Sequence, residues 1–147
     1  MKALEQRYAI TFMETVHAIP GARGREIFNV GPMENHMVAW SGISFELKQA
    51  LLSLVEERKI VVMGIDSSFY RILKEEYQKH PGNESIVDVC ERLMNLPRAS
   101  MDDALEQKHY DDAHWLPAMI LLRPPEDHLD SLMFQSYTKD GQQKYEA

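Results

Sequence analysis

The stretch "SGISFELKQALLSLVEERKIVVMGIDSSFYRIL", residues 41–73, carries the clearest structural pattern in the chain. Ser44 is a typical N-cap residue, and leucines at helical spacing follow it, which predicts a helix over residues 44–59. The next residues, "IVVMG", are apolar and β-branched and predict a strand. Turn-forming residues in "IDSS" then precede "FYRIL", which predicts the second strand of a hairpin.

The residues before this stretch predict two more helices. Apolar side chains recur every four residues over 2–19, and Pro20 and Gly21 end that pattern. The segment "IFNVGP" suggests a short extended piece closed by a turn. "MENHMVAW" predicts a short helix from Glu34 to Trp40, which Ser41 and Gly42 would end.

The order helix, helix, tight turn, helix, hairpin over residues 2–75 resembles the winged helix-turn-helix superfamily. Met37, Val38 and Trp40 match the inner face of its second helix. Gly42 matches the turn glycine, and "ISFELKQALLSLVEERKIVV" matches a recognition helix that runs directly into a strand. The resemblance implies an α+β fold with a winged-helix-like domain at residues 1–80.

Residues 81–147 form the remaining, acidic part of the chain, which we expect to pack on that domain or to dimerise. The segment "ESIVDVCERLMNL" predicts a helix ended by Pro97, and Ser100 predicts the N-cap of another. The apolar run "PAMILLR" predicts a strand. The C-terminal extension is therefore expected to contain both helices and strands.

Composition indicates a globular chain. Of the 147 residues 44% are hydrophobic and 27% charged, close to ordinary globular usage, and no apolar run is long enough to span a bilayer. The N-terminus lacks the uninterrupted apolar centre of a signal peptide, so we expect a cytoplasmic protein. The single cysteine, Cys90, cannot form an internal disulfide and is expected to be a small core residue.

The net charge of −7 lies in the second half of the chain. Residues 1–80 hold ten basic and ten acidic residues, whereas residues 81–147 hold six basic and thirteen acidic ones. An acidic surface repels phosphate backbones, so any nucleic-acid contact must come from the first half.

The resemblance implies a DNA-binding accessory protein or transcriptional regulator, with DNA as partner and a homodimer as one arrangement that would read two half-sites. Ser44, Lys48 and Gln49 are the expected contacts on the recognition helix, with Arg71 beside the wing. Arg23 and Arg25 would add positive charge nearby. The wing "GIDSS" offers an aspartate and no cation, which favours weak, salt-sensitive binding.

Phe45 and Leu52 suggest a different function. On the projecting helix they would form a docking patch for a protein partner, unless they are buried against the C-terminal half. The alternative function is therefore a protein-binding winged-helix effector, of phage or plasmid type, that modulates nucleic-acid machinery without strong DNA binding of its own.

Enzyme signatures are not found in the sequence. "HYDDAHW" contains His109 and His114, but these are five residues apart, and on a straight helix they would point in different directions. Neither a nucleophile motif nor a phosphate-binding loop is present. We therefore expect no catalytic activity, no metal and no cofactor.

Overall fold

The computed structural model describes residues 9–122, 139–140 and 142–143. The elements are, in chain order, β1 (Ala9–Thr11), α2 (Phe12–Ala18), β2 (Arg23–Asn29), the 3-10 helix η1 (Met33–Asn35), β3 (Met37–Ile43), α3 (Phe45–Glu56), β4 (Ile60–Gly64), α4 (Ser68–Gln78), α5 (Glu84–Met94), α6 (Met101–Leu105), β5 (His114–Trp115), β6 (Ala118–Leu122), β7 (Lys139–Asp140) and β8 (Gln142–Gln143). The fold is thus α+β, as the sequence predicted.

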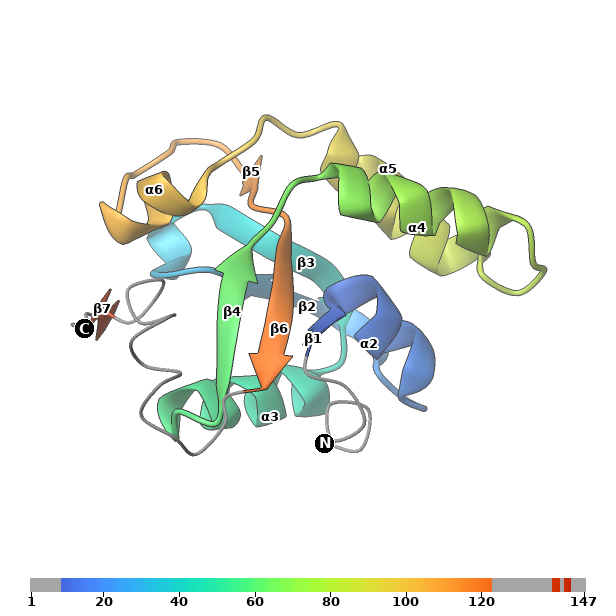
Figure 1. Ribbon diagram of the computed structural model, residues 1–147, viewed down its shortest axis with the longest axis horizontal. Helices are drawn as coiled ribbons and strands as arrows, with labels where there is room; N and C mark the ends of the chain where they lie inside the picture. The colour runs from blue at the N-terminus through green and yellow to red at the C-terminus, as the bar shows by residue number, and fades with distance from the viewer. Residues whose placement is uncertain (1–8, 123–138, 141, 144–147) are drawn as a thin grey trace.

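Two three-stranded sheets organise residues 9–122 (Figure 1). In the first, β6 lies between β1 and β4 and is antiparallel to both. In the second, β3 lies between β2, its antiparallel partner, and β5, its parallel partner. The second half of the chain supplies β5 and β6, so both halves contribute strands to each sheet.

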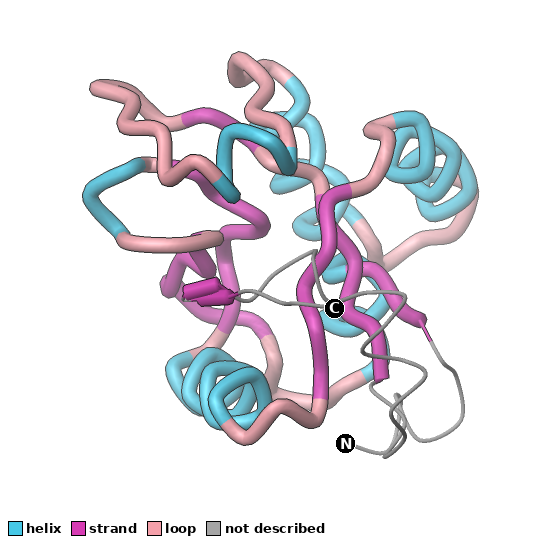
Figure 2. Tube along the Cα trace, turned by 60° about the vertical axis from the view of Figure 1, so that its left-hand side comes forward, coloured by secondary structure: helices cyan, strands magenta, loops and turns pink. Residues whose placement is uncertain are grey.

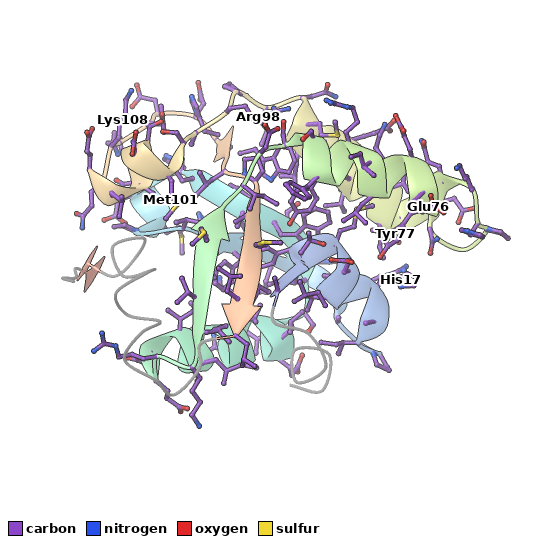
Figure 3. All side chains as sticks on the ribbon, viewed as in Figure 1. His17, Glu76, Tyr77, Arg98, Met101 and Lys108 are labelled. Atoms are coloured by element: carbon purple, nitrogen blue, oxygen red, sulfur yellow. The ribbon has the colours of Figure 1, made fainter. Side chains whose placement is uncertain are left out.

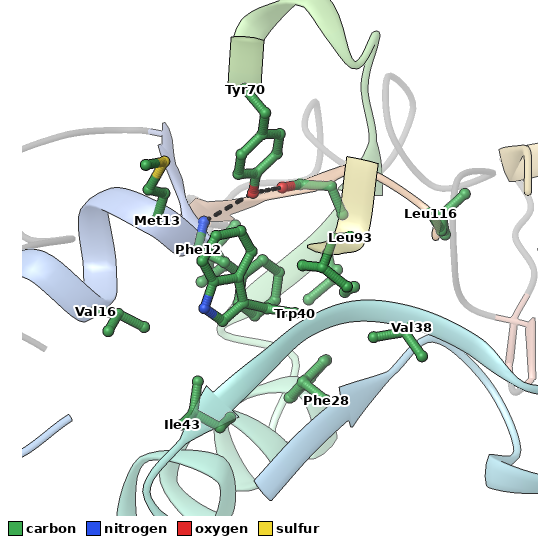
Figure 4. Packing of buried hydrophobic residues seen from close by; sticks show 14 of the residues in the cluster. Phe12, Met13, Val16, Phe28, Val38, Trp40, Ile43, Tyr70, Leu93 and Leu116 are labelled. Atoms are coloured by element: carbon green, nitrogen blue, oxygen red, sulfur yellow. Dashed lines mark hydrogen bonds between the residues drawn. The ribbon is translucent and has the colours of Figure 1, made fainter. Parts of the chain in front are cut away.

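The core is built around Tyr70, which α4 carries into the interior (Figure 4). Its ring stacks on Trp40 with centroids 5.6 Å apart and meets the edge of Trp115 at 5.3 Å. Its hydroxyl donates to the carbonyl of Ala118 at 2.5 Å and accepts from the N–H of Phe12 at 3.0 Å. One buried side chain therefore joins α4 to β6 and to the first turn of α2, whose N–H groups lack helical partners.

Several predicted elements are confirmed. The helix after Ser44 forms as α3, and "IVVMG" forms β4. The helix of the acidic half forms as α5, and Ser100 caps α6. The apolar run before Pro124 forms β6. Cys90 is fully buried, as expected of a core residue, and this burial raises the pKa of its thiol to about 11.

The helix predicted from Glu34 to Trp40 is wrong. Only Met33–Asn35 form a single 3-10 turn, and Met37–Ile43 form the central strand β3. The run Met37 to Trp40 is buried on both faces, because α2 and α5 contact β3 and the Tyr70 ring of α4 stacks on Trp40. A continuous apolar run of this kind has the same appearance in a buried strand and in a buried helix, so periodicity could not distinguish them.

The hairpin predicted at "FYRIL" is also wrong, since these residues lie in α4. The segment "IDSS" starts this helix: the Asp66 carboxylate accepts a hydrogen bond from the Ser68 N–H at 2.9 Å. Tyr70, Leu73 and Tyr77 then face the protein interior at helical spacing. Residues 34–75 therefore form neither the helix-turn-helix nor the wing that the resemblance implies.

The N-terminal helix predicted over residues 2–19 is shorter than expected. Residues 2–8 lie outside the described part, Ala9–Thr11 form β1, and the helix begins at Phe12. Thr11 and Glu14 form a capping box there, which fixes the helix start. Across residues 9–122, every helix is too short or too polar to traverse a bilayer.

Candidate functional site

The outer surface of α3 is the part of the sequence-predicted site that the structure assembles. Leu47 and Leu51 face the core, and the helix packs against β2 and β4. On the opposite side lie Phe45, 58% exposed, and Leu52, 41% exposed. At about 100° per residue these two side chains are about 20° apart around the helix axis. Both are thus exposed on one face, and the described residues do not bury them.

The charges exposed on α3, those of Glu46 and Glu56, lie near its two ends. The exposed residues of α3 between Glu46 and Glu56 are all uncharged, namely Gln49, Ala50, Leu52 and Ser53. We define the α3 outer surface as these four residues together with Phe45. Lys48 lies beside it, half-buried, and its ammonium is paired with Glu26 on β2 at 3.4 Å. An uncharged centre with an exposed aromatic residue, and acids at its rim, has the composition of a protein interface.

The N-terminus of α3 is held by the start of β2. The Ser44 hydroxyl accepts from the Leu47 N–H at 3.1 Å, and the Ser44 N–H donates to the Ala22 carbonyl at 2.7 Å. A bulge in β2 brings Gly24 against this corner, where a Cβ would lie 2.6 Å from the Cα of Ser44. Only glycine allows so close an approach.

The C-terminus of α3 is equally well defined. Arg58 has the left-handed backbone conformation with φ 64°, and its N–H donates to the Val55 carbonyl. The Lys59 N–H donates to the Leu54 carbonyl at 2.9 Å, which completes a Schellman motif. Both ends of the helix are therefore fixed, and its outer surface is presented by a rigid element.

The residues expected to bind DNA do not form one surface. Ser44 is buried and used as a cap, and Lys48 is paired with Glu26, which leaves Gln49 as the exposed polar candidate on α3. Arg71 lies on α4, which Figure 1 and Figure 2 both place far from α3.

The two arginines of β2 are arranged differently from each other. Arg23 donates to the Ser85 hydroxyl on α5 at 2.6 Å, whereas Arg25 is exposed in the bulge. The positive charge predicted around a recognition helix is thus distributed over three elements, and DNA binding stays a prediction without a shared surface among these residues.

The histidine-containing segment "HYDDAHW" forms a loop and then β5. The ring of Tyr110 stacks on His114 at 3.6 Å, and its hydroxyl donates to Asp103 at 2.6 Å, which raises the pKa of Tyr110 to about 12. Within the described ranges, no three His, Cys, Asp or Glu side chains are arranged to hold a metal ion.

Sequence reasoning missed a cleft of about 380 Å³ at the end of β4. Asp66, Ser67, Arg98 and Ser100 line it together with apolar side chains. The sequence pattern places Asp66 in a hairpin turn, and Arg98 belongs to no motif. The two residues are 32 positions apart, so no pattern in the sequence indicates that they lie at one cleft.

Comparison of the chain with protein-family models, curated proteins and solved structures finds no significant match.

Proposed function

We propose that this chain is a protein-binding module whose partner docks on the α3 outer surface. The observation that carries the proposal is the exposure of Phe45 and Leu52 on one face of a helix that is capped at both ends. Aromatic and aliphatic side chains lose little on desolvation, and a few residues at the centre of an interface supply most of its binding free energy.

The spacing on α3 indicates how the partner would bind. Phe45, Gln49 and Leu52 occupy positions i, i+4 and i+7, the arrangement by which an amphipathic helix enters an apolar groove. The partner is therefore expected to offer an apolar groove or helix pair with few charges. Of the two functions expected from the sequence, this geometry supports protein binding, because the two protein-contact residues share a surface and the six DNA-contact residues do not.

Site-specific photo-crosslinking tests the proposal. A photoreactive phenylalanine analogue replaces Phe45 in one variant and Phe69, the exposed phenylalanine of α4, in a matched control. In cells that naturally express the chain, we expect one discrete protein adduct from position 45 and not from position 69. Equal adducts from both positions, or none from position 45, would contradict the proposal.

A double substitution measures how much the α3 outer surface contributes to binding of the partner. Phe45→Ser with Leu52→Ser should weaken capture of the crosslinked partner at least about thirtyfold, the effect of losing one hot-spot side chain. Its free energy of unfolding should change by less than about 0.5 kcal/mol, since both side chains are exposed. Phe69→Ser with Ile72→Ser removes the same residue classes from α4 and should leave capture unchanged.

A gel-shift titration at low salt distinguishes the DNA-binding alternative. We expect no shifted duplex at about 50 mM salt, where phosphate contacts are strongest. A shift that Gln49→Ala and Lys48→Ala both abolish, with capture of protein unaffected, would favour the DNA-binding function over the protein-binding one.

A further inference from the structure

The cleft at the end of β4 lies on the opposite side of the molecule from α3 and is independent of the proposed function. It is bounded by the β4–α4 junction, by residues 98–101 and by Leu116 and Pro117. Its volume of about 380 Å³ exceeds the roughly 230 and 220 Å³ of two other clefts and falls within the range of small-molecule sites. Figure 3 labels Arg98 and Met101, which lie around this end of β4.

Arg98 is held in place by three contacts. Its Nη1 donates to the carbonyls of Met94 at 3.0 Å and Leu96 at 2.8 Å, at the end of α5. Its guanidinium lies over the Trp115 ring, 4.9 Å from the centroid. These contacts use one of the three guanidinium nitrogens, and Nε and Nη2 donate to no described residue. A fixed guanidinium with a free edge suits a carboxylate, which it can bind with two parallel hydrogen bonds.

Asp66 supplies the opposite charge at the same cleft. Its Oδ1 accepts the Ser68 N–H, and this bond lowers the pKa of the carboxyl, so the group is ionised at neutral pH. The described residues form no ion pair between Asp66 and Arg98. The Ser68 N–H, the Ser68 hydroxyl and the charge of Arg71 act on the Asp66 carboxylate, whose remaining lone pairs can accept from a ligand. Ser67 makes no capping bond with its hydroxyl and can assist.

The floor of the cleft is apolar. Ile65, Met101 and Leu116 are among the residues that line it. Met101 is held over the edge of β4 because its Sδ accepts the Gly64 N–H at 3.3 Å, and a Cβ on Gly64 would already lie 3.2 Å from that sulfur. The floor is thus shaped by a close approach that a larger residue at position 64 would disturb.

From this arrangement we propose that the cleft binds a free α-amino acid with an apolar side chain. Its carboxylate is bound by Arg98, its ammonium by Asp66, and its side chain lies on the apolar floor. A simple anion such as phosphate is repelled by Asp66, and a simple amine is repelled by Arg98, so the pair of charges selects a zwitterion.

The test uses the full chain labelled with ¹⁵N and L-leucine or L-methionine as ligand, each added up to about 10 mM, because millimolar affinity is within reach of a few polar contacts. We expect amide shifts at residues 64–67 and 98–101. N-acetyl-leucine, which lacks the ammonium, and leucinamide, which lacks the carboxylate, should each bind at least about tenfold more weakly.

A conservative variant tests the role of Asp66. Asp66→Asn keeps the oxygen that caps α4 and removes the charge, so leucine should bind at least about tenfold more weakly and lose its advantage over N-acetyl-leucine. Asp112→Asn, an exposed aspartate outside the cleft, is the control and should bind leucine normally. Absence of shifts at residues 64–67 and 98–101, or equal binding of all three ligands, would overturn the proposal.

Discussion

The two helices on either side of β4 use their side chains differently. α3 buries Leu47 and Leu51, and its exposed charges, Glu46 and Glu56, lie at the two ends of its outer surface. α4 also exposes apolar residues, Phe69 and Ile72, but Arg71, Glu75 and Glu76 lie among them. Inward, α4 carries Tyr70, whose hydroxyl bonds two backbone groups in the core.

This difference between α3 and α4 indicates which of their exposed apolar residues are expected to bind a partner. Exposed apolar residues scattered among charges are common on any protein and need no partner. The exposed aromatic and aliphatic pair of α3 shares one face, with the exposed acids Glu46 and Glu56 at its two ends, and such a pair favours docking. We therefore expect substitutions in α4 to affect stability and substitutions on the outside of α3 to affect binding.

The largest effect on stability is expected at Tyr70. Tyr70→Ala should cost about 3–5 kcal/mol through the cavity it leaves. Tyr70→Phe should cost about 1–3 kcal/mol, because the Phe12 N–H and the Ala118 carbonyl lose a buried partner. Urea unfolding followed by circular dichroism measures both. Tyr110→Phe, which removes one half-buried hydroxyl bond to Asp103, is the comparison. A Tyr70→Phe variant that loses no more stability than Tyr110→Phe would show that the two core bonds contribute little.

A smaller effect distinguishes the starts of the two helices. Ser44→Ala should cost about 1 kcal/mol, since the hydroxyl caps the Leu47 N–H. Ser67→Ala should change stability by less than about 0.5 kcal/mol, because the Ser67 side chain makes no capping bond. Urea midpoints of the two variants provide the comparison, and equal losses would mean that Ser44 does not act as a cap.

The smallest effect concerns the pH dependence of α4. The hydrogen bond from the Ser68 N–H lowers the pKa of Asp66 below its ordinary value of 3.8. The stabilisation of the folded state by this hydrogen bond is therefore complete above pH 3.8, and it is lost as the pH falls through the lowered pKa of Asp66. The stability difference between the wild type and Asp66→Asn should stay constant above about pH 5 and shrink as the pH falls below 3.8. A difference that does not shrink below pH 3.8 would contradict the assignment.

The sequence predicted those elements whose pattern is local. Ser44 with the leucines after it predicted α3 and its cap, and β-branched residues predicted β4. Met37 to Trp40 could not be assigned locally, because burial on both faces removes the alternation that identifies a strand. Asp66 to Ser68 satisfy both a hairpin turn and a helix start, and the choice depends on Tyr70 reaching Ala118, a contact 48 residues away.

The site was predictable to a similar extent. Phe45 and Leu52 were expected to share a face, because their seven-residue spacing fixes it once α3 forms. The cleft could not be predicted from the sequence, because Asp66 and Arg98 come together only through the packing of α4, α5 and α6 around the end of β4. Charges that meet through tertiary structure leave no spacing in the sequence.

The position of β6 between β1 and β4 has a consequence for synthesis of the chain. These two strands are made early, and among the described residues each hydrogen-bonds only to β6 within its sheet. A ribosome that has completed residues 9–117 has therefore produced two strands with unpaired edges and no bonds between them. Because unpaired strand edges are templates for aggregation, the nascent chain carries its greatest hazard just before the last strand of this sheet emerges.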